Sequence, residues 1–187
     1  MTPAPTPTPL PQPLTNHKVI QVAYVVNNLE QAAHKWIQSF GIGPFFVLEK
    51  PQITDPTYRG TPNEVSFSTA VAQAGDMHIE LVEQHCDSPS CYRDMFAKGE
   101  EGFHHVAVIA EDYEAEIARY AAQGREMAFA GISGPMKFSY VDMRPDLPFM
   151  IEVLENKAFI VDYFAKVKEA GETWDGSDPI RDAASLF

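Results

Sequence analysis

Residues 102–120, GFHHVAVIAEDYEAEIARY, hold an apolar strand-like run that leads directly into an amphipathic helical pattern. A similar pattern occurs earlier, in residues 20–44, IQVAYVVNNLEQAAHKWIQSFGIGP. The chain therefore contains an internal repeat, which predicts two similar structural halves.

Each half continues with further strand-like segments. The segments 77–84, MHIELVEQ, and 149–156, FMIEVLEN, resemble each other, and the runs 64–73 and 137–143 precede them. Each half is thus a strand, a helix and about three more strands. The first half is 12 residues longer, and the Pro- and Thr-rich segment 51–62 can absorb that excess as a loop. We predict an α+β fold in which two half-sheets pair and curl into one open cup with a mixed sheet and helices on the outside.

The domain organisation follows from the repeat. We expect a Pro-rich N-terminal arm over residues 1–17 and a core domain over residues 18–156. Within the core, the modules are 18–85 and 102–156. Residues 157–187 form a C-terminal extension that begins as a helix and covers the rim of the cup or forms a dimer contact.

Composition excludes several classes of partner. With 14 Lys and Arg against 26 Asp and Glu, the net charge is −12, which argues against nucleic acid and anionic membrane surfaces. No apolar run has the length of a membrane span, and the N-terminus lacks the basic and apolar regions of a secretory signal. The two cysteines, Cys86 and Cys91, fit a reducing cytoplasm. With His85 they are interpreted as loop residues, because a second pair of metal ligands is missing from the sequence.

The alternation of side chains along the strands predicts which residues line the cup. Neighbouring side chains on a strand point to opposite faces, and the helices must cover the more apolar face. Gln21 and His105 should therefore point into the cup, and His104 should point toward the helix. The same reasoning places Glu80 and Glu152 inside the cup.

These four inward side chains predict a metal site. Burying two carboxylates without partners costs several kcal/mol, and a divalent cation removes that cost. An amide oxygen, an imidazole and two carboxylates suit Zn, Ni, Co, Mn or Fe(II). The predicted metal ligands are Gln21, Glu80, His105 and Glu152. On an octahedral ion they leave open positions for water or a chelating substrate.

With this ordered set of ligands and the duplication, the sequence resembles the vicinal oxygen chelate superfamily over roughly residues 18–156. That superfamily includes glyoxalase I, methylmalonyl-CoA epimerase, extradiol dioxygenases and bleomycin-resistance proteins. The resemblance implies paired βαβββ modules around one divalent metal, and a homodimer. It also implies enolisation of a metal-bound carbonyl compound, in which a ligand glutamate, Glu152 or Glu80, acts as the base.

The residues narrow the choice within this superfamily. Gln21 stands where extradiol dioxygenases have a histidine, and Glu80 adds a carboxylate, which disfavours dioxygen chemistry. Val25 and Glu101 occupy the positions of the arginines with which glyoxalase I binds glutathione, so dependence on glutathione is not expected. His78 lies two residues before Glu80 on the cup face and is a candidate for a second acid/base or for orienting a ligand; the alternative is an ordinary histidine in the cup wall.

The sequence therefore predicts a metal-dependent isomerase, epimerase or glyoxalase-type lyase that acts on a small, neutral or weakly charged carbonyl compound. The alternatives are a non-catalytic small-molecule binding protein of the resistance type and, less favoured, an extradiol-type dioxygenase. A local basic cluster for coenzyme A phosphates would have to come from Lys18, Lys50, Arg59 or Lys137.

Overall fold

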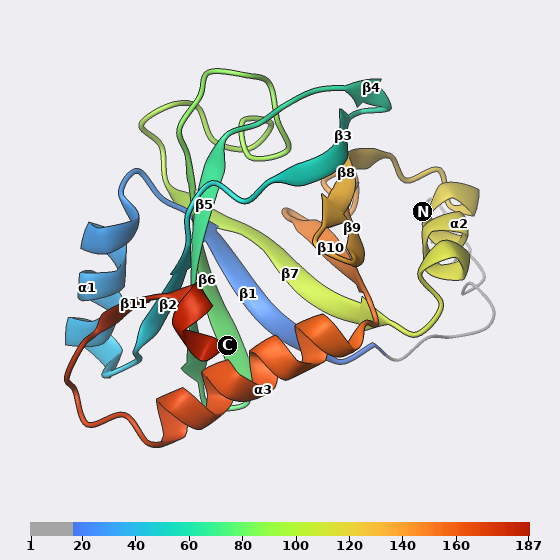
Figure 1. The fold of residues 1–187 in the computed structure, drawn as a ribbon. Helices are drawn as coiled ribbons and strands as arrows, with labels where there is room; N and C mark the ends of the chain where they lie inside the picture. Colours follow the sequence, from blue (N-terminus) through green and yellow to red (C-terminus); the bar gives the residue numbers. More distant parts are fainter. Residues whose placement is uncertain (1–16) are drawn as a thin grey trace, which may run out of the picture.

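Eleven strands form one continuous mixed sheet in the computed structural model, which describes residues 17–187 (Figure 1). The predicted Pro-rich arm, apart from His17, lies outside the described residues. The strands are β1 (Val19–Val25), β2 (Phe45–Leu48), β3 (Ile53–Tyr58), β4 (Thr61–Pro62), β5 (Phe67–Ala74), β6 (Met77–Gln84), β7 (Gly102–Ala110), β8 (Met127–Ser133), β9 (Met136–Asp142), β10 (Met150–Glu155) and β11 (Ile180–Asp182). The helices are α1 (Leu29–Phe40), α2 (Tyr113–Ala122), α3 (Ala158–Glu172) and the 3₁₀ helix η1 (Ala183–Leu186). Of the helices described, none is long and apolar enough to cross a membrane.

The predicted α+β fold and its duplication are confirmed by the order of the strands. The first half contributes β2-β5-β6-β1 and the second contributes β7-β10-β9-β8. The two halves join through the antiparallel pair β1 and β7, and each of these strands pairs on its other side with a parallel strand, β6 or β10. Four neighbouring strands, β6-β1-β7-β10, therefore form the floor of the cup.

Two helices cover the outer face of the sheet, as the sequence predicts. The side chain of Asn28 caps α1 by accepting a hydrogen bond from the Gln31 backbone N–H, and α1 ends at Gly41 in the left-handed conformation, φ 67°. Asp112 caps α2 in the same way. The third helix, α3, packs on the opposite face, against β5, and runs across the open side of the cup (Figure 1).

The segment predicted as a loop over residues 51–62 forms the short hairpin β3–β4. Strand β3 leaves its own half and pairs antiparallel with β8 of the second half. The pairing shifts register between Thr54 and Thr57, around Pro56. Proline usually argues against a strand, so the Pro-rich composition predicted a loop here. Proline is tolerated in strands at edge and bulge positions, and β3 and β4 use such positions.

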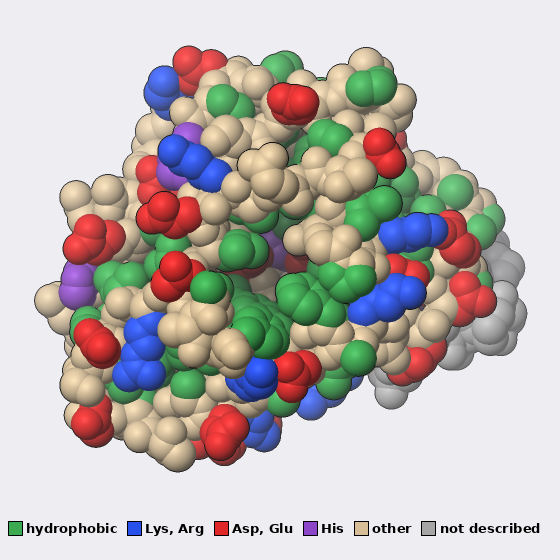
Figure 2. All heavy atoms as spheres, in the orientation of Figure 1, with side chains coloured by type: hydrophobic (Ala, Val, Ile, Leu, Met, Phe, Trp, Pro, Cys, Tyr) green, Lys and Arg blue, Asp and Glu red, His purple; other side chains and the backbone are tan. Residues whose placement is uncertain are grey.

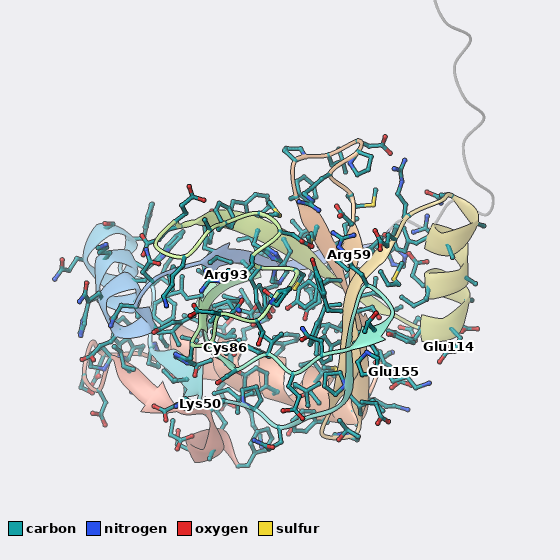
Figure 3. The ribbon with its side chains drawn as sticks, turned by 90° about the horizontal axis from the view of Figure 1, so that it is seen from above. Lys50, Arg59, Cys86, Arg93, Glu114 and Glu155 are labelled. Carbon is teal, nitrogen blue, oxygen red and sulfur yellow. The ribbon has the colours of Figure 1, made fainter. Side chains whose placement is uncertain are left out.

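A group of charged side chains anchors this hairpin. Arg59, in the turn after β3, donates a 2.8 Å hydrogen bond to the Asp142 carboxylate and a 2.6 Å hydrogen bond to the Asp94 carboxylate. Arg144 also donates to Asp142, at 2.6 and 2.9 Å. The labelled Arg59 lies beside the second half of the sheet in Figure 3. Hydrogen bonds from Arg144 and Arg59 hold the pKa of Asp142 below its usual range, although partial burial opposes this.

The lowered pKa of Asp142 predicts a specific loss of stability in acid. A carboxyl whose pKa is lower in the folded protein stabilises the fold above its unfolded pKa of about 4 and loses that contribution as the pH falls through the folded pKa. Asp142→Asn should therefore lower the free energy of unfolding by about 2 kcal/mol at pH 7. The free energy of unfolding of this variant should also fall less than that of the wild type when the pH is lowered below 4. Urea titrations at pH 7 and at lower pH values measure both effects.

Asp146→Asn is the matched control, because Asp146 pairs with Arg125 at a more exposed position. The free energy of unfolding of this variant should lie within about 1 kcal/mol of the wild-type value at each pH. Equal losses for both variants would contradict the role given to Asp142.

Candidate metal centre

The four inward side chains predicted from the strand pattern come from the four strands of the cup floor, and two alanines lie between them. Ala23 on β1 is paired with Glu80 on one side and with His105 on the other. Ala107 on β7 is paired in the same way with Gln21 and Glu152. Both alanines are fully buried. Their small side chains leave space above the sheet into which the four longer side chains extend.

Three of the predicted ligands converge closely. The Nε2 atom of His105 lies 3.2 Å from Oε2 of Glu80 and 3.5 Å from Oε2 of Glu152. One potential ligand atom from each residue lies within 4.8 Å of the others, and all three residues are buried. Gln21, which is 2% exposed, lines the same cavity as the two glutamates. The buried Glu80, His105 and Glu152 group could hold one divalent ion.

The ring of His104 determines which nitrogen of His105 faces the carboxylates. Nε2 of His104 lies 3.0 Å from the backbone carbonyl oxygen of Cys91, which can only accept, so this nitrogen carries the proton. The other ring nitrogen of a neutral His104, Nδ1, is then an acceptor, 2.9 Å from Nδ1 of His105. His105 therefore donates through Nδ1–H and turns the lone pair of Nε2 toward Glu80 and Glu152.

Burial and charge act in opposite directions on these two histidines. Burial, and the positive charge of His105, lower the pKa of His104 to about 3, so that it stays neutral. Burial would also lower the pKa of His105, but hydrogen bonds to Glu152 and Glu80 outweigh it and raise the pKa to about 9. Burial raises the pKa of Glu80. The carboxylates thus favour a positive charge beside Nε2 of His105, which a proton or a metal ion can supply.

The pairing of the buried polar atoms shows that Glu80 and His105 fit a metal ion. When His105 is neutral, its Nε2 is an acceptor that faces Oε2 of Glu80, and neither of these two buried atoms has another hydrogen-bond partner. Buried polar atoms are normally paired, and two acceptors facing each other repel. A cation between them satisfies both, and the N/O donor set is of the kind that first-row divalent metals prefer.

Above the group lies a cavity of about 330 Å³. Gln21, Glu80 and Glu152 line its floor, and aromatic side chains such as Phe67, Phe138 and those of α3 form most of its wall. In Figure 2 the face of the molecule is hollowed near its centre, and hydrophobic side chains surround the hollow. Such an apolar cavity with a few convergent polar groups is typical of a small-molecule site.

His78 lies at the edge of the cup floor, under α3. Its ring stacks on Phe164 with centroids 4.4 Å apart, and its Nδ1 is 3.2 Å from the backbone carbonyl oxygen of Ile20. Burial lowers the pKa of His78. The side chain is 8% exposed and does not belong to the described cavity lining.

Sequence reasoning placed His104 against the helix, but its ring lies beside Tyr92, Tyr140 and the Cys91 carbonyl oxygen, where the pairing of β7 with β1 shifts register. Tyr140 on β9 and Tyr163 on α3 line the cavity, and the Tyr140 hydroxyl lies 3.3 Å from that of Tyr92. Burial raises the pKa of Tyr140 well above its usual value, so the hydroxyl keeps its proton. No spacing in the sequence links Tyr163 or the Cys91 carbonyl to the cup. Cys86 and Cys91 themselves are free thiols, and neither belongs to the three-residue group.

Comparison with solved structures gives the same fold at low sequence identity. A methylmalonyl-CoA epimerase bound to methylmalonyl-CoA and NH4+ has a TM-score of 0.54 at 16% identity, with 76% of this chain and 96% of that chain covered. The epimerase from Mycobacterium tuberculosis has a TM-score of 0.54 at 16% identity, covering 80% and 97%. A hypothetical protein from Bacillus halodurans C-125 has a TM-score of 0.53 at 19% identity, covering 76% and 96%. A search of curated protein sequences gives no match.

A sequence profile supplies the family. The profile of the Glyoxalase/Bleomycin resistance protein/Dioxygenase superfamily matches residues 20–140, which is more than half of the chain. This range includes both repeated strand–helix segments, the strands β2 to β8 and the two alanines of the cup floor. The chain belongs to the Glyoxalase/Bleomycin resistance protein/Dioxygenase superfamily.

Proposed function

We propose that this protein is a metal-dependent enzyme that epimerises or isomerises a small carbonyl compound by enolisation. One observation carries the proposal: two carboxylates and one imidazole nitrogen face one another, buried, at the floor of an apolar cavity. Glu80, His105 and Glu152 would hold the ion, with Gln21 as the fourth ligand. When bound, a divalent cation would act as a Lewis acid that polarises the substrate carbonyl and stabilises negative charge on its oxygen.

The side chains of the cavity would carry the proton transfer. Glu152 and Glu80 are the candidates for the base that removes the α-proton, because both carboxylates face the cavity. The same or the other carboxylate returns the proton, on either face of the carbon for an epimerase or at another carbon for an isomerase. The hydroxyl of Tyr140 stays protonated and is placed to donate a hydrogen bond into the cavity. The aromatic walls keep water away from the reacting atoms.

For His78 we propose a positioning role. Because its ring stacks on Phe164 and its Nδ1 faces the Ile20 carbonyl, it links α3 to the first strand of the cup floor. A direct acid/base role would require the ring to leave Phe164. The homodimer stays a prediction from the family.

A binding protein without catalysis is the rival function. The same cavity would sequester an apolar molecule without a metal. It would not need two buried carboxylates beside His105, because burying two negative charges against one protonated imidazole costs free energy. Metal content separates the two functions.

The first test is the metal content of protein purified without added metal. The wild type should contain about one equivalent of a divalent transition metal, and Glu152→Gln should lose most of it, because a neutral amide replaces an anionic ligand. Elemental analysis of both proteins gives the answer. Glu155→Gln is the matched control, since Glu155 ends the same strand, is only half-buried and pairs with Lys157 outside the three-residue group. Wild-type protein that holds no metal, even after titration, would exclude the enzyme mechanism.

The second test is exchange of α-protons. In D₂O, metal-loaded protein should exchange the α-protons of neutral ketones faster than metal-free protein does, with proton NMR as the readout. Glu80→Gln or Glu152→Gln, whichever is the base, should slow exchange per bound metal by about a hundredfold or more. Loaded wild-type protein that exchanges no ketone of a size series faster than the same free metal would contradict enolisation.

The third test addresses His104. His104→Asn keeps an acceptor at the position of Nδ1, because the amide oxygen is the same number of bonds from the backbone, and it should bind metal nearly as the wild type does. His104→Gln keeps a polar group near Nε2 but loses that acceptor, so its metal affinity should fall about 10- to 100-fold. Competition with a chromophoric chelator measures both affinities. The reverse order for the two variants would show that His104 does not orient His105.

A further inference from the structure

The C-terminal segment of this chain forms the roof of the cavity. Phe159, Ile160, Tyr163 and Phe164 of α3 line it from above, and the segment 183–187 closes one side. Strand β11 fixes that segment by pairing with β2 at the edge of the sheet. The family profile ends at residue 140, so the roof lies outside the part of the chain by which the family is recognised.

Two phenylalanines form the outer part of this roof. The rings of Phe159 and Phe187 are stacked, with centroids 6.1 Å apart and an angle of 14° between their planes. They are 42% and 66% exposed, and both also line the cavity. Nζ of Lys166 lies 4.1 Å from the centroid of the Phe187 ring. The two rings therefore lie between solvent and one part of the cavity.

The lining carries negative charge and no positive charge. Among the described residues, the charged side chains that line the cavity are the carboxylates Glu80, Glu152 and Asp182. A phosphate or carboxylate group against the walls of the cavity would find no basic side chain among these lining residues, and removing it from water would be unfavourable. The rest of the lining is mainly hydrocarbon and aromatic surface.

The basic side chains considered for coenzyme A phosphates do not gather near the cavity. Arg59 is bound to Asp94, Asp142 and Glu126. Lys137 is bound to Glu114, and Lys18 and Lys50 are exposed. Figure 3 shows Lys50 and Arg59 on well-separated parts of the molecule. None of these four residues lines the described cavity.

Resting on the function proposed above, we propose that the substrate is a neutral carbonyl compound with a compact hydrocarbon body, and that Phe159 and Phe187 are its specificity residues. The carbonyl group faces the floor and the hydrocarbon body lies against the roof. Coenzyme A thioesters, which solved epimerases of similar fold bind, do not fit as substrates, because the lining offers their phosphates no basic side chain. The cavity volume, about 330 Å³, is at the lower end of the range for small-molecule sites, which suits one compact ligand.

Binding to the full-length, metal-free protein tests this proposal separately from catalysis. The probe is 6-propionyl-2-dimethylaminonaphthalene, a neutral naphthyl ketone whose emission shifts to the blue in apolar surroundings. It should bind with a clear blue shift. The ketone 2-acetylnaphthalene should displace the probe at a concentration at least tenfold lower than 2-naphthoate does. The naphthoate has the same rings but carries a negative charge. Acetyl-CoA should not displace the probe at 1 mM, so its binding free energy should be weaker than about −4.1 kcal/mol.

The variants Phe159→Ala and Phe187→Ala should each weaken probe binding by about tenfold, because each removes an aromatic wall from the ligand. Phe40→Ala is the matched control, since Phe40 is an exposed phenylalanine of α1 away from the cavity, and it should bind as the wild type does. Displacement by acetyl-CoA or naphthoate as readily as by the ketone, or unchanged binding in both roof variants, would overturn the proposal. Protein that binds the probe but no metal would instead contradict the enolising enzyme and leave the ligand class intact.

Discussion

The burial of two carboxylates beside one imidazole is the constraint on which the rest of the site depends. Like charges at this distance are tolerated in a dry cavity only when a positive charge lies between them. The fold supplies one half of the solution, since four neighbouring strands hold the side chains in place without any loop. The other half comes from His104, whose neutral ring directs the lone pair of His105 toward the carboxylates.

The alternation of side chains in the strands allowed much of the cup to be predicted. Gln21 and His105 each stand two residues before an alanine, and Glu80 and Glu152 stand within alternating strands of identical pattern. Because a strand has a period of two, the direction of each of these side chains followed once the apolar face was known. The pairing of Ala23 and Ala107 with all four of them is the three-dimensional form of that pattern.

What the sequence did not reveal depends on contacts between distant segments. The Cys91 carbonyl meets His104 through a loop that has no periodic pattern, and Tyr163 reaches the cavity only because α3 crosses the open side of the sheet. The hairpin at 53–62 carries two prolines and pairs at an edge, where strand signals are weakest. In each case the role of the residue depends on the distant segment that it contacts, and the local sequence does not reveal that contact.

The pairing of β3 with β8 has a consequence for how the duplicated chain holds together. Two simple tandem modules could unfold one after the other, because each would contain all of its own strand partners. Here the first half places a strand in the sheet of the second, and Arg59 fixes it there through Asp142. Neither half is complete alone, so the two repeats form one cooperative unit and not two exchangeable modules.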